Sequence, residues 1–191
     1  MIIFMIKTLA KSIREYKKLT IITPILVGLE VIMDILIPFI MSKIVDNGME
    51  VGNHSYDHKY LPSMSKSLIL EEINKTNKIF NNLTGKNMTL FRAPYGEVKA
   101  SYLAETGFPS IVWSVDTLDW QSRNKDKVYA KIMNSKDGDI VLMHSLYKST
   151  ADAVKMAIPE LYKKGFQIVS VSELYALKGK TLEAGKSYWH A

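Results

Sequence analysis

One apolar run near the N-terminus constrains this chain more than any other feature. Residues 19–44 read LTIITPILVGLEVIMDILIPFIMSKI, which is long enough to cross a bilayer as a single helix. Five basic residues precede the run, namely Lys7, Lys11, Arg14, Lys17 and Lys18. This arrangement is typical of a membrane anchor whose N-terminus lies inside the cell. We therefore predict a hydrophobic N-terminal segment, residues 1–48, with a transmembrane helix over about 19–44.

Two carboxylates within the run, Glu30 and Asp34, argue against a lone anchor. A charged group at the middle of a bilayer is costly, so such residues usually face a partner helix or a cavity. Two alternatives therefore stay open. The run could be the buried core helix of a globular protein, or residues 20–27 could pack as a strand in the domain that follows.

Composition limits the chemistry of the remaining chain. The 191 residues are 47% hydrophobic, as in a globular protein with one domain of ordinary size. The net charge of +6 would suit an anionic partner, but the lysines are scattered, so we expect a solvated surface and no nucleic-acid binding. Because the chain has no Cys, any metal ion must be held by His, Asp or Glu.

After Gly48 the sequence alternates between apolar runs and turn signals. Strands that alternate with helices favour an α/β barrel or an open sheet. We predict helices at about 70–83, 127–133, 149–164 and 172–177, and strands at 110–114, 140–144 and 167–171. We expect the tail, residues 179–191, to be loosely attached.

Four separated motifs in this second part carry chemically useful side chains. They are VGNHSYDH at 51–58, FRAPYG at 91–96, SVDTLDW at 114–120 and IVLMHS at 140–145. Each motif alone has an ordinary explanation: His54 and His58 could be surface residues, FRAPYG a proline turn, and Leu142 and Trp120 core residues. Their combination and order resemble the polysaccharide deacetylases of the NodB-homology type, carbohydrate esterase family 4. The resemblance covers residues 49–178, with Ala93 where the family has proline.

The resemblance implies a fold and a reaction. The fold expected is α/β, a partial deformed (β/α) barrel of NodB type, preceded by the hydrophobic helix. The reaction is metal-dependent hydrolysis that removes N-acetyl groups from a cell-wall polysaccharide such as peptidoglycan or chitin-like N-acetylglucosamine. His54 and His58 would bind the divalent metal, which is expected to be zinc, with cobalt or manganese as alternatives. The chain would sit in the cell membrane with its deacetylase domain facing outside.

The family also suggests roles for residues of the other motifs. Arg92 would orient the catalytic base, and the backbone N–H of Tyr95 would stabilise the oxyanion. His144 would protonate the departing amine, with its tautomer held by Asp119. The acetyl pocket would be lined by Trp120 and Leu142. We expect Asp116 to be a turn or surface acid.

One family motif is missing from the chain. The family begins with a Thr-Phe-Asp-Asp-Gly-Pro run whose two acids supply the catalytic base and the third metal ligand, and no such run occurs here. Residues 1–48 stand where it is expected, and with Pro24 and Pro38 they resemble the start of an ATP-binding-cassette exporter, as in a chimera. No Walker A glycine loop follows that could bind ATP.

The missing motif leaves three functions open. The chain could be a deacetylase in which some other acid, such as Asp57, replaces the lost ligand. It could be an inactive protein that binds glycan in a groove lined by Tyr56, Tyr95 and Trp120. It could also be a membrane-protein fragment whose partner is another exporter helix.

Overall fold

The computed structural model describes residues 6–7, 11 and 16–191, so the predicted role of Arg14 in the basic flank lies outside the described residues. The chain divides into two compact units, Met1–Asn47 and Gly48–Ala191.

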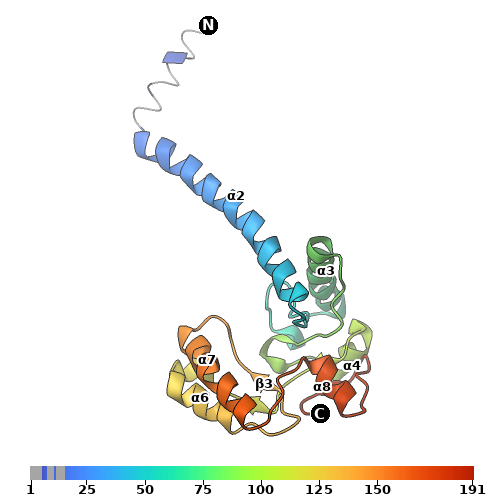
Figure 1. The fold of residues 1–191 in the computed structure, drawn as a ribbon. Coiled ribbons are helices and arrows are strands. Elements are labelled where there is room, and N and C mark those ends of the chain that lie inside the picture. The colour runs from blue at the N-terminus through green and yellow to red at the C-terminus, as the bar shows by residue number, and fades with distance from the viewer. Residues whose placement is uncertain (1–5, 8–10, 12–15) are drawn as a thin grey trace. The chain divides into compact units, whose positions relative to one another are not determined.

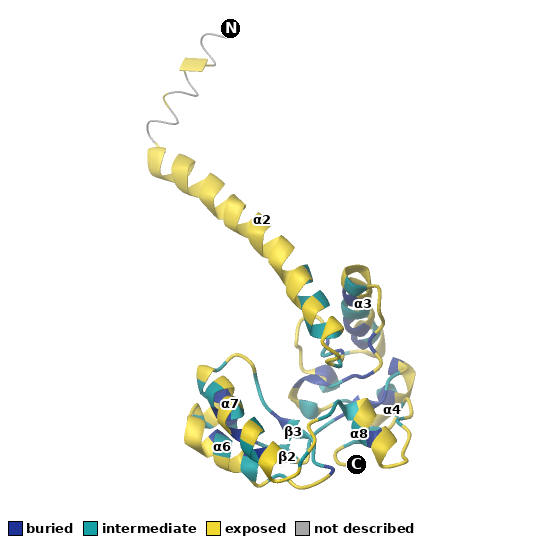
Figure 2. Cartoon of the chain, viewed as in Figure 1, coloured by how far each residue is buried: buried dark blue, intermediate teal, exposed yellow. Residues whose placement is uncertain are grey.

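The first unit contains one long helix, α2 (Lys17–Asp46), which includes the whole predicted span (Figure 1). Its most apolar 18-residue window has a mean hydropathy of 2.2, so the helix is long and apolar enough to cross a membrane. No residue of α2 is buried, and Figure 2 shows the helix almost entirely in the colour of exposed residues. The prediction of a buried core helix is therefore wrong. The strand suggested for residues 20–27 is also wrong, because these residues are helical.

The first helical elements of the second unit are a short turn, η1 (Leu61–Ser63), and the amphipathic helix α3 (Lys66–Thr84). Ser65 begins α3 by accepting a hydrogen bond from the Leu68 N–H, and Gly85 ends it in the left-handed conformation. α3 therefore starts four residues earlier than the sequence predicts. Its buried apolar positions recur at helical spacing and join a core made of Leu61, Ile69, Ile73, Phe91, Ala93 and Leu103.

Parallel strand contacts bring together the segments that carry the motifs. Asn53 bridges Phe91, and Phe91 bridges Ser110, both in parallel orientation. Ser110 lies in β1 (Ser110–Ile111), while β2 (Val115–Asp116) pairs in parallel with β3 (Val141–Leu142). Because the paired strands in the described residues form two separate two-stranded sheets, the α/β fold is a partial barrel that does not close.

Short helical segments connect these strands. They are η2 (Pro94–Gly96), α4 (Ala100–Leu103), η3 (Ala104–Thr106) and α5 (Asp119–Ser122). The longer helices α6 (Lys125–Met133) and α7 (Lys148–Lys163) lie side by side in Figure 1, and α8 (Val171–Leu177) follows them. A second core cluster joins α6 to α7 through Val128, Ile132, Ala153, Ala157 and Leu161.

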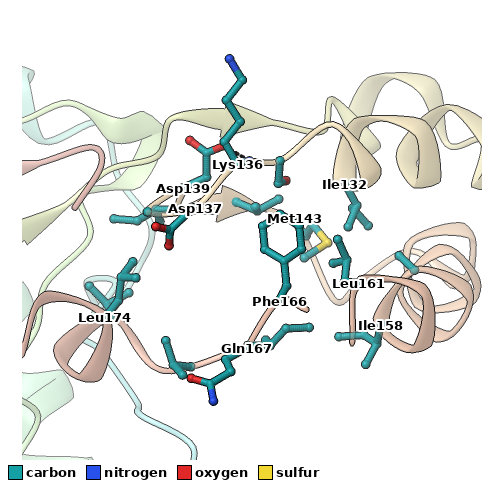
Figure 3. Close-up of a pocket in the computed structure, with 18 of the residues that line it drawn as sticks. Ile132, Lys136, Asp137, Asp139, Met143, Ile158, Leu161, Phe166, Gln167 and Leu174 are labelled. Carbon is teal, nitrogen blue, oxygen red and sulfur yellow. Dashed lines mark hydrogen bonds between the residues drawn. The ribbon is translucent and has the colours of Figure 1, made fainter. Parts of the chain in front are cut away.

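An apolar cavity of about 300 Å³ adjoins this second cluster (Figure 3). Its wall includes Val141 and Met143 on or beside β3, Leu161 of α7, and the segment 166–169. The sequence predicts a strand at 167–171, but among the described residues this segment pairs with no strand. The prediction fails because a strand exists only where a neighbour completes its ladder, and here a cavity borders the segment.

The C-terminal tail is firmly attached, which contradicts the sequence prediction. Its strand β4 (Ser187–Tyr188) pairs in parallel with β1, and the Ala191 N–H donates to the Gly138 carbonyl at 3.0 Å. The Tyr175 hydroxyl also donates to the His190 carbonyl at 2.7 Å. Gly138 has a φ of +91°, and a Cβ there would lie 2.7 Å from the His190 ring, so a glycine is needed for the tail to pack.

Candidate active site

The two predicted metal ligands lie together on a tight loop that follows a buried bridge residue. Asn53 is 1% exposed, and its bridge to Phe91 aligns the loop with the FRAPYG segment. The ring centroids of His54 and His58 are 4.9 Å apart and the rings are nearly perpendicular, at 81°. The spacing of four residues thus brings both imidazoles to one place without a helix.

His54 is fixed in one tautomer. Its Nδ1 lies 2.5 Å from the carbonyl oxygen of Arg92, and because a carbonyl only accepts, the proton must be on Nδ1. The lone pair of Nε2 is then free for a ligand, as in most metal-binding histidines. Burial lowers the pKa of His54 to about 4, assisted by the charges of Arg92, His58 and His144. The ring is therefore neutral near pH 7, as metal binding requires.

Arg92 lies in the same neighbourhood, but its guanidinium has no carboxylate partner among the described residues. Burial lowers the pKa of Arg92. A partly buried cation without a counter-charge is costly, because it loses hydration and gains no ion pair in return. Among the described residues of the second unit, no carboxylate thus pairs with Arg92 as the resemblance would expect of a catalytic base.

Tyr95 extends the site on the other side of His58. Its ring makes an edge contact with His58, with the centroids 5.1 Å apart, and it is 63% exposed. Its backbone is left-handed, with a φ of +60°, inside the short turn η2. The Tyr95 N–H donates to no group within the described chain, so it is available to an incoming oxygen as the resemblance suggests.

Asp119 and His144 form a hydrogen-bonded pair in which the carboxylate is buried and the imidazole is partly exposed. Asp119 is fully buried at the start of α5, and its Oδ1 accepts from His144 Nδ1 at 2.8 Å. Its Oδ2 accepts from the His144 backbone N–H at 2.6 Å and from the Thr150 hydroxyl at 2.8 Å. Burial alone would raise the pKa of Asp119, but these hydrogen bonds outweigh burial and lower it. The ionised carboxylate therefore leaves His144 Nε2 as the ring atom that can exchange a proton with a ligand.

The remaining predicted residues of these two motifs take different positions. Leu142 lies in β3 and is 8% exposed, whereas Trp120 is 47% exposed beside Asp119. A large ligand could therefore reach the side chain of Trp120 readily, but not that of Leu142. The Asp116 carboxylate accepts from the Leu118 N–H at 2.9 Å, as expected of a turn acid.

Sequence reasoning missed two residues that hold these groups in place. Asn53 donates from its side chain to the Ile73 carbonyl at 2.9 Å and to Asn77 at 2.7 Å, which ties the histidine loop to α3. Thr150 supplies a further hydrogen bond to Asp119 from its hydroxyl. Their partners are distant in sequence, so no local pattern could have identified them.

The donor set suits a divalent metal only in part. Two imidazoles fit two ligand positions, but no group of three or more His, Cys, Asp or Glu side chains gathers anywhere among the described residues. Asp57 does not fill the gap, because its carboxylate pairs with Lys59 at 2.7 Å and is 44% exposed. The described residues therefore offer two ligands here, one fewer than the three protein ligands of a typical catalytic zinc site.

Comparisons with known proteins place these features in context. The sequence model of the polysaccharide deacetylase family matches residues 2–109. A peptidoglycan-N-acetylglucosamine deacetylase, PgdA of Listeria monocytogenes, is 38% identical over 153 residues, which are 80% of this chain and 32% of that protein. The chain thus spans about a third of the length of this curated relative.

Two solved structures have the same fold. A family 4 acetyl xylan esterase from Clostridium thermocellum in complex with cobalt superposes with a TM-score of 0.75 at 26% identity, covering 81% of this chain and 78% of that chain. A CE4 family pseudoenzyme from Bacillus anthracis superposes with a TM-score of 0.67 at 29% identity, covering 81% and 55%. A mutant of that pseudoenzyme has restored enzymatic activity.

Proposed function

This chain belongs to the polysaccharide deacetylase family, and from this premise we propose that its site recognises an N-acetylated cell-wall glycan of the peptidoglycan type. The family is that of CE4 hydrolases, and the Listeria relative is named for N-acetylglucosamine in peptidoglycan. The proposal rests on the His54 and His58 rings, which lie together beside the Tyr95 turn, and on the Asp119–His144 pair, whose imidazole is near enough for its charge to lower the pKa of His54.

In this proposal each half of the site has its own task. A divalent metal bound at His54 and His58 would polarise the acetyl oxygen and lower the pKa of a bound water. His144 would donate a proton from Nε2 to the departing amine, and the hydrogen bond from Nδ1 to Asp119 holds the ring in the tautomer that allows this. The Tyr95 N–H would donate to the oxygen that gains charge.

Turnover is the part of the reaction that we propose this chain lacks. No described carboxylate pairs with Arg92, and none joins the two histidines to make a third metal ligand. Loss of a positioned general base costs about 10²–10⁴-fold in rate, and a missing ligand would weaken metal binding as well. Binding of a glycan without release of acetate is therefore the second candidate function, and the unpaired Arg92 is the observation that favours it.

Glycan binding by the full chain in detergent tests this proposal. We expect N-acetylglucosamine oligomers to bind, and their chemically deacetylated counterparts to bind more weakly because the acetyl group is lost from the pocket. Trp120→Ala should weaken binding because it removes an exposed ring on which a sugar can stack. The matched control is Trp189→Ala, which removes an exposed tryptophan of the C-terminal tail. Equal binding of both glycans, or no binding, would contradict the proposal.

We further propose that α2 anchors the chain in the cell membrane with the second unit outside. The length and mean hydropathy of α2 and the basic residues before it support this. Fractionation of the untagged chain should place it in membranes, and protease added to intact cells should cleave the second unit. Full recovery in the soluble fraction would exclude the anchor.

A further inference from the structure

The loop that carries His54 and His58 has a strained backbone. Ser55 and His58 both have positive φ values, +63° and +53°, in the left-handed region that residues with a Cβ seldom occupy. Such a conformation persists only where surrounding contacts determine it. Something outside the two histidines must therefore hold the loop.

Side-chain acceptors satisfy all four backbone N–H groups of residues 55–58. The Ser55 N–H donates to Asn53 Oδ1 at 2.9 Å, and the His58 N–H donates to Ser55 Oγ at 3.1 Å. The two N–H groups between them, those of Tyr56 and Asp57, donate to a single oxygen, Oε2 of Glu72, at 3.0 and 2.7 Å. Two of the acceptors, Asn53 and Ser55, belong to the loop or directly precede it. Glu72 is the acceptor that comes from another element, the helix α3.

Glu72 is suited to this task by burial and charge. It projects from α3 and is only 8% exposed, which is unusual for a glutamate. Its other oxygen, Oε1, pairs with Lys59 at 3.3 Å, just beyond His58. A carboxylate forms stronger hydrogen bonds with N–H groups than a neutral oxygen does. The charge of Glu72 therefore strengthens the two bonds that fix the backbone between the two imidazoles.

The same helix holds the loop at its other end. Asn53, directly before His54, donates to the Ile73 carbonyl one residue after Glu72 and to the Asn77 side chain. α3 therefore positions the backbone on both sides of His54. The two rings that this support adjoins have their centroids 4.9 Å apart.

We propose that Glu72 is a positioning residue, which fixes the His54–His58 loop and thereby sets the affinity of the site for a divalent metal. The part of the inference that concerns metal rests on the proposed function. The part that concerns the loop rests on hydrogen bonds alone, so the two can be tested separately.

Amide hydrogen exchange in the metal-free full chain tests the loop. In Glu72→Ala, the amides of Tyr56 and Asp57 should exchange at least about tenfold faster, because each loses a hydrogen bond worth roughly one factor of ten. The amide of Arg92, which donates to the Asn53 carbonyl, should be unchanged. Unchanged exchange at Tyr56 and Asp57 would overturn the proposal whether or not the protein binds metal.

Titration with Zn²⁺, followed through the NMR signals of the two imidazoles, tests the consequence. Glu72→Ala should bind the ion about 10–100-fold more weakly, the usual loss when a residue that orients a ligand is removed. Glu72→Gln keeps an oxygen acceptor without the charge, so it should recover part of the affinity. The matched control is Glu71→Gln on the exposed side of α3, which removes the same charge one residue away and should bind as the wild type does.

Thermal unfolding of each variant separates positioning from general stability. If Glu72→Ala unfolds at the assay temperature, Glu72→Gln alone decides, and wild-type affinity with wild-type exchange rates in that variant would overturn the proposal. Equal losses of affinity in the Glu71 and Glu72 variants would also overturn it. A wild-type chain that binds no Zn²⁺ would instead defeat the proposed function together with the metal part of this inference.

Discussion

The two halves of the site differ in how their charged groups are partnered. On one side the buried Asp119 carboxylate accepts four hydrogen bonds, two from His144, one from the Thr150 hydroxyl and one from the Trp120 N–H, so neither of its oxygens is unsatisfied. On the other side His54 and His58 lie together, but Arg92 pairs with no described carboxylate. The first half is built wholly from residues 119–150, within one compact unit. In the second half, no described carboxylate of the same unit joins the two histidines or pairs with Arg92. We therefore expect the first half to be complete and the second to lack an acid.

Supplying the missing acids should have the largest effect. Replacement of residues 1–44 by a strand that carries Thr-Phe-Asp-Asp-Gly-Pro should raise acetate release by at least about 10²–10⁴-fold, the contribution of a positioned base. The matched control is the same graft with both acids changed to Asn, which should remain at background. The gain should also disappear on His144→Ala, and a graft that stays active without His144 would show that the first half is not the proton donor.

Removal of Asp119 should show how much its hydrogen bonds contribute to the free energy of unfolding. Asp119→Ala leaves donors of Trp120, His144 and the buried Thr150 without an acceptor, so we expect the free energy of unfolding to fall by about 3–5 kcal/mol. Asp116→Ala, which removes a turn acid with one hydrogen bond, should cost about 1 kcal/mol. Urea unfolding of both variants makes the comparison. Equal costs would show that the Asp119 network contributes little.

Metal affinity should show that the other half is incomplete. Because two imidazoles are fewer than the three protein ligands of a typical catalytic zinc site, we expect the chain to lose Zn²⁺ readily on dialysis. His54→Ala should abolish the remaining binding, whereas His190→Ala in the C-terminal tail should not change it. If Zn²⁺ is retained through dialysis and Asp57→Asn then releases it, Asp57 would be the replacement ligand and the comparison would fail.

Acidification should destabilise the fold through His54. We expect this effect to be smaller than those of the three preceding changes. The unfolded chain takes up a proton on this ring near pH 6.5, but burial lowers the folded pKa to about 4. Between these values the unfolded state binds more protons, so the contribution is fully present above pH 6.5 and is lost as the pH falls toward 4. Urea unfolding at pH 7 and pH 5 would measure this. The free energy of unfolding should fall less between the two pH values in His54→Gln than in wild type. Equal losses would mean that His54 does not remain neutral in the fold.

The sequence predicted the helices better than the strands, for a physical reason. α3 and α7 have apolar residues at helical spacing and end near Gly85 and Gly165, so local signals were sufficient. β4 has two residues, and only its pairing with β1 makes it a strand. Residues 167–171 carry a strand-like sequence, but a cavity borders them and no strand pairs with them in the described structure.

The site could be predicted only where its residues fall within motifs. The resemblance led to His54, His58, Asp119 and His144, and the structure brings each pair together, although their roles in catalysis remain predictions. Glu72, which binds the loop from another element, gave no local signal, because a glutamate in an amphipathic helix ordinarily faces solvent.

Acetate release by the unmodified chain tests the central claim most directly. The chain in detergent would be incubated with N-acetylglucosamine oligomers and peptidoglycan fragments, each with Zn²⁺, Co²⁺ or Mn²⁺, and acetate would be measured beside the grafted protein. Because Arg92 lacks a described carboxylate partner and the two histidines lack a third ligand, we expect acetate at background. Turnover comparable to that of the graft would contradict the account, and a base would then have to be sought among Glu15, Glu30, Asp34, Asp46 and Glu50.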